Sequence, residues 1–211
     1  ASGSWDTTVK IWEMSSLKCL TTLEASGEVV SLSFSPDGKY IVAGSGGAPA
    51  MIWEVETSKR IAQIDAPEGI FSLSFSPDGK YLASGASNAV ILRDAQTFKC
   101  LATFEGHTER IMSLSFSGDG KYIASVGLWD KNVKIWEVQA SKLLAPLRSH
   151  NANLNSVSFS SNGRYVASAG SDDKVKVWDM QTSSCIATLE GQSGSVTAVS
   201  FTKDGKRIAS A

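Results

Sequence analysis

The sequence predicts an all-β chain made from one repeated unit of short strands. A Phe-(Ser/Thr)-x-(Asp/Asn)-Gly segment returns at nearly constant spacing, and apolar residues alternate with polar ones, as they do along half-buried strands. No stretch has the 3.6-residue period of an amphipathic helix. The 211 residues, 42% apolar and 19% charged, suffice for a packed globular core.

The repeated unit is 41 to 43 residues long, measured between successive phenylalanines of this segment. The five markers are Phe34, Phe75, Phe116, Phe159 and Phe201. A tryptophan series lies in the same frame, at Trp12, Trp53, Trp136 and Trp178, with Arg93 at the remaining place. We therefore expect residues 1–211 to form a single domain of five repeats.

Each unit is expected to contain four strands. The inner strand ends at the phenylalanine, and an Asp-Gly or Asn-Gly turn follows, because glycine tolerates positive φ in tight hairpins. The second strand is exemplified by residues 81–84, the third carries the tryptophan, and the outer strand is exemplified by residues 185–189. Short strands in units of this length predict a β-propeller of five four-stranded blades.

The units resemble the WD-repeat β-propeller family, whose repeat carries Gly-His, then Asp-Gly, then Asp, then Trp-Asp. The resemblance covers the whole chain and implies a buried polar network of His, Ser or Thr, Asp and Trp in each well-formed blade. Two units carry all four residues: His107, Ser125, Asp130 and Trp136 in one, and His150, Ser168, Asp172 and Trp178 in the other.

Two other units lack most of this network. At its four positions the unit of Phe34 has Ala25, Ala43, Gly47 and Trp53, and the unit of Phe75 has Ala66, Ser84, Ser87 and Arg93. Packing alone must hold these blades, so we expect lower local stability there.

The net charge and the sequence motifs limit the classes of function that fit this chain. Twenty Lys and Arg against 21 Asp and Glu give a net charge of -1, which argues against nucleic acid and anionic membranes as partners. No metal-ligand cluster or nucleotide motif rises above the repeat, so we expect no metal, no cofactor and no enzyme. The catalytic alternative is a hydrolase that uses His107 or His150. Because the same Ser, His and Asp set occurs at equivalent positions of two repeats, a structural role is favoured for both histidines.

The three cysteines lie seven residues after the tryptophan position of their own units. Cys19, Cys100 and Cys185 therefore belong to different blades, too far apart for a disulfide. We expect them to be small buried side chains in a reducing compartment, the cytoplasm or the nucleus.

The resemblance implies a non-catalytic scaffold that binds protein or peptide partners at the rim of the central channel. Two tryptophans lie outside the repeat series, directly before turn aspartates, and tryptophan is enriched among interface hot spots. The start of the inner strand, which faces the channel in the family, varies in chemistry. The candidate partner-binding residues are Trp5, Trp129, Phe71, Met112, Arg110 and Asn155. A purely structural or designed propeller without a ligand is the alternative.

The number of blades follows from the repeat register. Ser2 and Ser210 share one register, so the chain spans five repeats and overlaps itself by a few residues. Because most rings of this family have seven blades, we expect part of a larger ring. The alternative is a closed five-bladed ring whose N-terminal strand completes the last blade. An open ring would expose strand edges, through which copies could associate.

Overall fold

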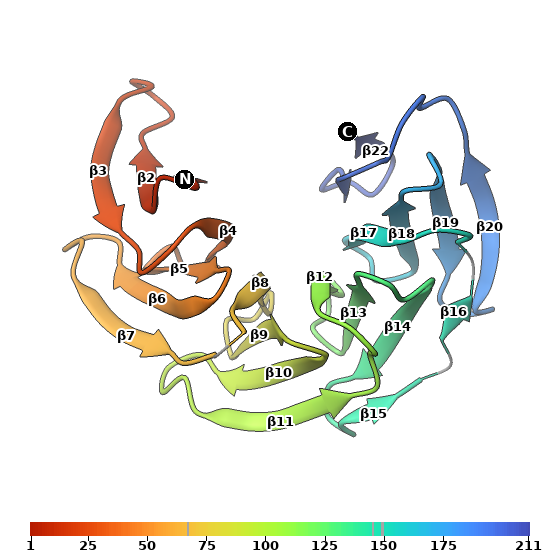
Figure 1. Ribbon diagram of the computed structural model, residues 1–211, viewed down its shortest axis with the longest axis horizontal. Coiled ribbons are helices and arrows are strands. Elements are labelled where there is room, and N and C mark those ends of the chain that lie inside the picture. Colours follow the sequence, from red (N-terminus) through yellow and green to blue (C-terminus); the bar gives the residue numbers. More distant parts are fainter. Residues whose placement is uncertain (67, 145, 149) are drawn as a thin grey trace.

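The computed structural model describes residues 1–66, 68–144, 146–148 and 150–211. Within these ranges the chain forms six antiparallel sheets and no helix. The sheets follow one another around an arc, and the first and last sheets face each other across a gap (Figure 1). The fold is therefore an all-β, propeller-like arrangement that is not closed. We number the sheets blade 1 to blade 6 along the chain.

The first three blades lie in the N-terminal half. Blade 1 consists of β1 (Ser2–Gly3), β2 (Thr8–Trp12) and β3 (Cys19–Glu24). Blade 2 consists of β4 (Val29–Phe34), β5 (Tyr40–Ser45), β6 (Ala48–Glu54) and β7 (Arg60–Ile64). Blade 3 consists of β8 (Ile70–Phe75), β9 (Tyr81–Ala86), β10 (Ala89–Asp94) and β11 (Cys100–Glu105).

The other three blades complete the arc. Blade 4 consists of β12 (Ile111–Phe116), β13 (Tyr122–Gly127), β14 (Asn132–Glu137) and two short outer strands, β15 (Lys142–Leu143) and β16 (Leu147–Arg148), which both pair with β14. Blade 5 consists of β17 (Leu154–Phe159), β18 (Tyr165–Gly170), β19 (Val175–Asp179) and β20 (Ser184–Leu189). Blade 6 consists of β21 (Val199–Phe201) and β22 (Ile208–Ser210).

The prediction of five four-stranded blades needs one correction. The five phenylalanines mark five inner strands, but the last of these, β21, pairs only with β22, and β1 to β3 form a sheet before the first marker. Blades 2 to 5 are thus complete, and blades 1 and 6 are partial. Among the described residues no ladder joins blade 1 to blade 6, so the N-terminal strand does not complete the last blade in this structure.

The turn after each inner strand is built by the residues that made the repeat visible. In blade 2 the Ser35 hydroxyl donates to Asp37 Oδ1 at 2.6 Å and accepts from the Tyr40 backbone N–H at 2.9 Å. Gly38 has φ of 72°, which a side chain would strain. The same pattern closes the turns of blades 3 to 6, with Asn162 in place of Asp in blade 5 and Thr202 in place of Ser in blade 6.

Serines of the inner strands link each blade to the next. Ser31 Oγ accepts the backbone N–H of Leu73 at 3.0 Å, and Ser72 Oγ accepts that of Leu114 at 2.9 Å. Equivalent bonds join blades 4 and 5 and blades 5 and 6. An inner strand has a free edge towards the channel, and these hydroxyls satisfy backbone donors that its own sheet leaves unpaired.

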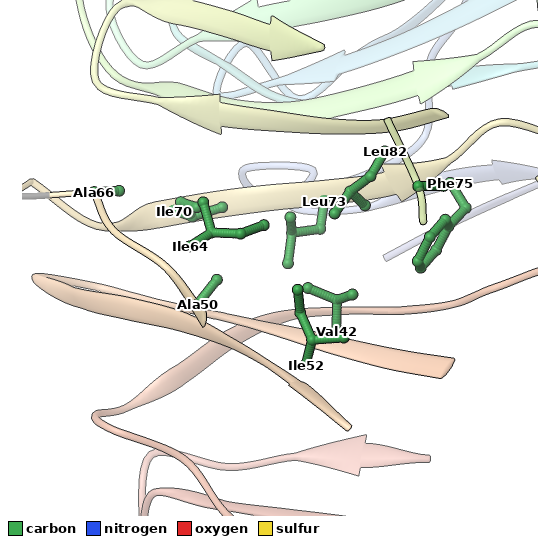
Figure 2. Packing of buried hydrophobic residues seen from close by; sticks show 10 residues of the cluster. Val42, Ala50, Ile52, Ile64, Ala66, Ile70, Leu73, Phe75 and Leu82 are labelled. Carbon is green, nitrogen blue, oxygen red and sulfur yellow. The ribbon is translucent and has the colours of Figure 1, made fainter. Parts of the chain in front are cut away.

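The hydrophobic core lies between neighbouring blades. Figure 2 shows Val42 and Ile52 of blade 2 facing Leu73 and Phe75 of blade 3. Phe75 is only 7% exposed, whereas Phe34 is 40% exposed, since blade 1 has no inner strand to cover it. The fold is therefore stabilised by blade-to-blade contacts, and each blade depends on its neighbours for burial.

The three cysteines correct a second prediction, because they are exposed and not buried. Cys19, Cys100 and Cys185 lie on the outer strands β3, β11 and β20, where the blades diverge from the channel and neighbouring sheets no longer cover them (Figure 1). All three are free thiols, and each Sγ donates to the carbonyl oxygen two residues further on.

Candidate partner-binding site

Blades 4 and 5 each contain a buried chain of hydrogen bonds. In blade 4 the Trp136 Nε1–H donates to Ser125 Oγ at 2.7 Å, the Ser125 hydroxyl lies 2.6 Å from His107 Nε2, and His107 Nδ1 contacts Asp130. A histidine with its proton on Nδ1 completes this chain, because every donor then meets an acceptor.

Blade 5 repeats the arrangement. Trp178 donates to Ser168 Oγ at 3.1 Å, Ser168 lies 2.8 Å from His150 Nε2, and His150 Nδ1 lies 2.8 Å from Asp172 Oδ1. The structure thus brings together both sets of four residues that the sequence singled out.

The protonation states agree with this geometry. Burial lowers the pKa of His107 and of His150, which keeps both rings neutral near pH 7. Burial alone would raise the pKa of Asp130, but hydrogen bonds from His107 and Lys134 hold it well below the ordinary value. Both imidazole side chains are 0% exposed, so neither is open to a substrate in this structure. This favours an architectural role over the hydrolase alternative.

Sequence reasoning missed one member of the blade 4 network. Lys134 is buried, with its Nζ 2.9 Å from Asp130 Oδ2 and 3.5 Å from His107 Nδ1. A lysine two residues before the tryptophan recurs as Lys10 and Lys176, and this recurrence was the available signal.

Blade 3 has a different interior at the same positions. Ser84 is fully buried but meets neither a histidine nor a tryptophan, and its hydroxyl makes a 3.4 Å contact with the Ile91 carbonyl. Arg93 replaces the tryptophan: its Nη1 donates to the Phe98 carbonyl at 3.4 Å, while its buried Nε has no partner among the described residues. Burial accordingly lowers the pKa of Arg93. Blade 3 therefore lacks the internal polar chain that blade 4 and blade 5 each contain.

The channel-facing candidates share a backbone feature that the sequence did not reveal. Each occupies the unpaired position of a β-bulge in its inner strand, where the register shifts by one residue. These residues are Phe71, Met112, Asn155 and the smaller Val30 of blade 2. Bulges redirect side chains and are frequent near functional sites. The bulge thus explains why the residue type at this position differs from one repeat to the next.

Two of the candidates, Phe71 and Arg110, meet at the junction of blades 3 and 4, and a third, Trp129, follows the residue that bonds to the Arg110 backbone. The Arg110 guanidinium lies 4.7 Å from the centre of the Phe71 ring, a cation–π contact between the two blades. The Arg110 carbonyl accepts the N–H of Leu128 at 2.9 Å, next to Trp129, whose side chain is 66% exposed. We call Phe71, Arg110 and Trp129 the blade 3/4 rim.

A hollow of about 350 Å³ adjoins this rim. It is lined by Glu68, Phe71, Ser87, Asn88, Thr108, Glu109 and Arg110. Thr108 also donates to Asp130 Oδ1 at 3.1 Å, which ties the wall of the hollow to the buried network of blade 4. One side of the hollow is therefore held rigidly.

The remaining candidates lie apart from this cluster. Trp5 is 75% exposed but belongs to the turn before β2 in blade 1, with blade 2 in between. The Asn155 amide donates to Ser195 Oγ at 2.9 Å and to the Val196 carbonyl at 3.0 Å, so it joins blade 5 to the segment before β21. Met112, partly buried on β12, lies two residues beyond Arg110.

Metal-binding clusters and membrane-spanning helices are absent from the part of the chain that the structure describes. No group of three or more His, Cys, Asp or Glu residues there is placed to hold a metal ion. No helix there is long and apolar enough to cross a membrane.

Comparison with known proteins identifies the repeat. The family model described as "WD domain, G-beta repeat" matches residues 1–13, 17–48, 58–94, 98–137, 141–179 and 183–211, which together make up most of the chain. A 46-residue segment is 46% identical to the "Ribosome biogenesis protein BOP1 homolog" of Dictyostelium discoideum. This match covers 22% of the chain and 6% of that protein, about the length of one repeat.

Proposed function

Because the chain belongs to the WD40-repeat family, we propose that it is a non-catalytic scaffold that binds a protein or peptide partner at the blade 3/4 rim. Proteins of this family generally mediate protein–protein interactions. The observation that carries the proposal is the stack of Arg110 on Phe71, together with an exposed Trp129 in the loop whose Leu128 bonds to the Arg110 carbonyl.

The physical chemistry of the rim supports this role. Trp, Tyr and Arg are the residues most often found to dominate binding energy at protein interfaces. The stack of Arg110 on the Phe71 ring restrains both side chains, so less side-chain entropy is lost when a partner binds. An exposed indole on the same blade junction as a preformed hollow is typical of a docking surface and not of a purely structural array.

The chemistry of the whole chain supports a protein partner in a reducing compartment. The net charge of -1 provides no electrostatic attraction for nucleic acid or anionic lipid. Three exposed free thiols on separate blades suit the cytoplasm or the nucleus, where thiols are kept reduced. The ribosome-biogenesis relative contributes no partner to the proposal, because the similarity extends over about one repeat.

The test compares two tryptophans of similar exposure on different blades. A partner is captured with the intact chain and identified, and its Kd is then measured with purified proteins. Trp129→Ala should weaken binding by about 2 kcal/mol or more, roughly 30-fold, while the fold is spared. Trp5→Ala on blade 1 is the matched control and should leave the Kd unchanged. An unchanged Kd for Trp129→Ala would rule out the blade 3/4 rim.

A further inference from the structure

Blade 3 has empty space where blade 4 holds its polar network. Ala66 stands at the place of His107 and Ser87 at the place of Asp130, in a loop two residues shorter. These small side chains border a second hollow of about 290 Å³. It is lined by Asp65, Ala66, Glu68, Gly69, Ala86, Ser87 and Ile91. The loss of the network has thus left a recess in blade 3, between the loop that precedes β8 and the turn that follows β9.

The recess adjoins the hollow of the blade 3/4 rim. Glu68 and Ser87 line both, and the Ser87 hydroxyl donates to Glu68 Oε2 at 2.5 Å. Gly69 keeps this wall close to blade 2, since a Cβ there would come within 2.3 Å of the Gly47 nitrogen. A chain segment bound at Trp129 and Phe71 can therefore continue over blade 3 without leaving the surface.

The lining of the recess combines apolar walls with an acidic edge. Ala66, Ala86 and Ile91 supply the apolar surface, and the exposed Asp65 and Glu68 stand at the edge. Asp65 accepts a hydrogen bond from the neutral Gln63 amide at 3.0 Å. Neither carboxylate forms an ion pair with a described Lys or Arg, and Arg110 is turned to Phe71. The edge thus carries two carboxylates that form no ion pair with any Lys or Arg whose side chain the structure describes.

We propose that this recess receives a lysine or arginine side chain of the bound partner, an inference that rests on the function proposed above. The aliphatic stem of the basic residue covers Ala66, Ala86 and Ile91, and its charged head turns back to Asp65 and Glu68 at the solvent edge. Long basic side chains commonly bury their stems and keep their charge hydrated in this way. Since the charge stays near water, the desolvation cost is small.

Blade 4 contains the internal counterpart of this pairing. Lys134, at the position of Ile91, places its Nζ 2.9 Å from Asp130 Oδ2. Blade 3 has neither this lysine nor this aspartate, and its acidic groups lie at the edge instead. The partner would supply the cation that blade 3 lacks.

The test uses capped amino acids as probes, so that the natural partner is not needed. N-acetyl-lysine methylamide and N-acetyl-arginine methylamide are titrated separately into the isotopically labelled full chain, and backbone amide shifts are followed by NMR. We expect saturable shifts at Gly69 and Ser87 for one or both cations, and larger shifts than with N-acetyl-norleucine methylamide. The two arms distinguish an ammonium from a guanidinium preference.

Two charge-matched double variants sharpen the result. Asp65→Asn with Glu68→Gln, which keeps an acceptor for Ser87, should weaken cation binding about 2- to 5-fold per lost charge pair. Glu24→Gln with Glu56→Gln, at exposed positions on blades 1 and 2, should leave it unchanged. Because all four positions are exposed, the fold should persist, which a cooperative thermal melt checks.

Two outcomes overturn the inference: no shift at Gly69 or Ser87 beyond that of norleucine, or equal effects of the two double variants. If Trp129→Ala abolishes partner binding while both cations fail to shift these amides, the blade 3/4 rim stands and only the recess inference falls. If the cations bind but Trp129→Ala leaves partner binding unchanged, the proposed function falls and the recess remains a separate basic-residue site.

Discussion

Blades 3 and 4 lie side by side, each between complete neighbours, yet they are held together differently. Much of their apolar interior is similar, since Ile70 and Leu82 of blade 3 are as fully buried as Ile111 and Ile123 of blade 4. Blade 4 adds a closed polar chain from Trp136 to Asp130, and blade 3 substitutes Ala66, Ser87 and Arg93. Hydrophobic packing between blades therefore suffices to form the fold, and we expect the polar network to supply additional local stability.

The same difference bears on function. In blade 4 the network fills the space between His107 and Asp130, whereas its loss leaves a recess at the equivalent residues of blade 3. The proposed partner site spans the boundary of the two, with Trp129 on blade 4 and the recess on blade 3. The expected lower local stability and the proposed binding surface would thus have one structural cause, the absent histidine and aspartate.

The largest effect is expected from removing the centre of the blade 4 network. Asp130→Ala leaves the buried Lys134 ammonium without its carboxylate and the His107 N–H without an acceptor. Breaking a buried ion pair in this way costs about 3–5 kcal/mol. Urea unfolding of the full chain measures it. Ser87→Ala, at the matching position of blade 3, should cost less than about 1 kcal/mol, and equal losses would contradict the comparison.

A smaller, pH-dependent effect should be confined to blades 4 and 5. The pKa of His107 and His150 is lowered in the folded chain by burial, so the unfolded chain takes up protons first as pH falls below the ordinary value of 6.5. Their contribution to stability is complete above that pH and declines below it. The aspartates, whose folded pKa is also lowered, add a further loss only as pH falls below about 3.8.

Hydrogen exchange at pH 7.5 and at pH 5, corrected for the intrinsic exchange rate, tests this prediction. Protection of β13, β14, β18 and β19 should fall relative to that of β9 and β10, since blade 3 contains no histidine. A uniform decrease in all blades would show that the histidines are not the cause.

The smallest effect should come from a partial repair of blade 3. Arg93→Trp removes a buried guanidinium nitrogen without a partner and offers an indole N–H to Ser84. One additional buried hydrogen bond contributes about 1 kcal/mol. The Tm of the full chain should rise. Arg207→Trp, at an exposed site of blade 6, is the control and should leave it unchanged. A lower Tm for Arg93→Trp would mean that the arginine fits this place better than the network residue does.

Much of this comparison could be predicted from the sequence, because it depends on residues in a fixed repeat frame. The strand order and the Asp-Gly turns follow from spacing and side-chain type, and the two complete networks follow from the resemblance to the WD-repeat family. The β-bulges could not be predicted, because Phe71 and Met112 look like ordinary members of an alternating strand. The exposed cysteines were mispredicted, since alternation along a strand does not reveal how far the strand lies from the channel.

The recess in blade 3 was also beyond the sequence. Ala66 and Ser87 indicated a missing network, but whether neighbouring side chains would collapse into the space depended on the packing of Gly69 against blade 2. The sequence likewise could not show that the Lys134 side chain points inward, because this depends on where Asp130 lies in the folded chain.

The central claim is that the residues of the buried network, Trp136 included, make blade 4 more stable than blade 3. Hydrogen exchange of the unmodified full chain at neutral pH tests it most directly, with β9 and β10 compared with β13 and β14. The account predicts markedly slower exchange in β13 and β14, by about 10-fold or more if the network adds at least 1.4 kcal/mol of local stability. Equal protection in the two blades would contradict it.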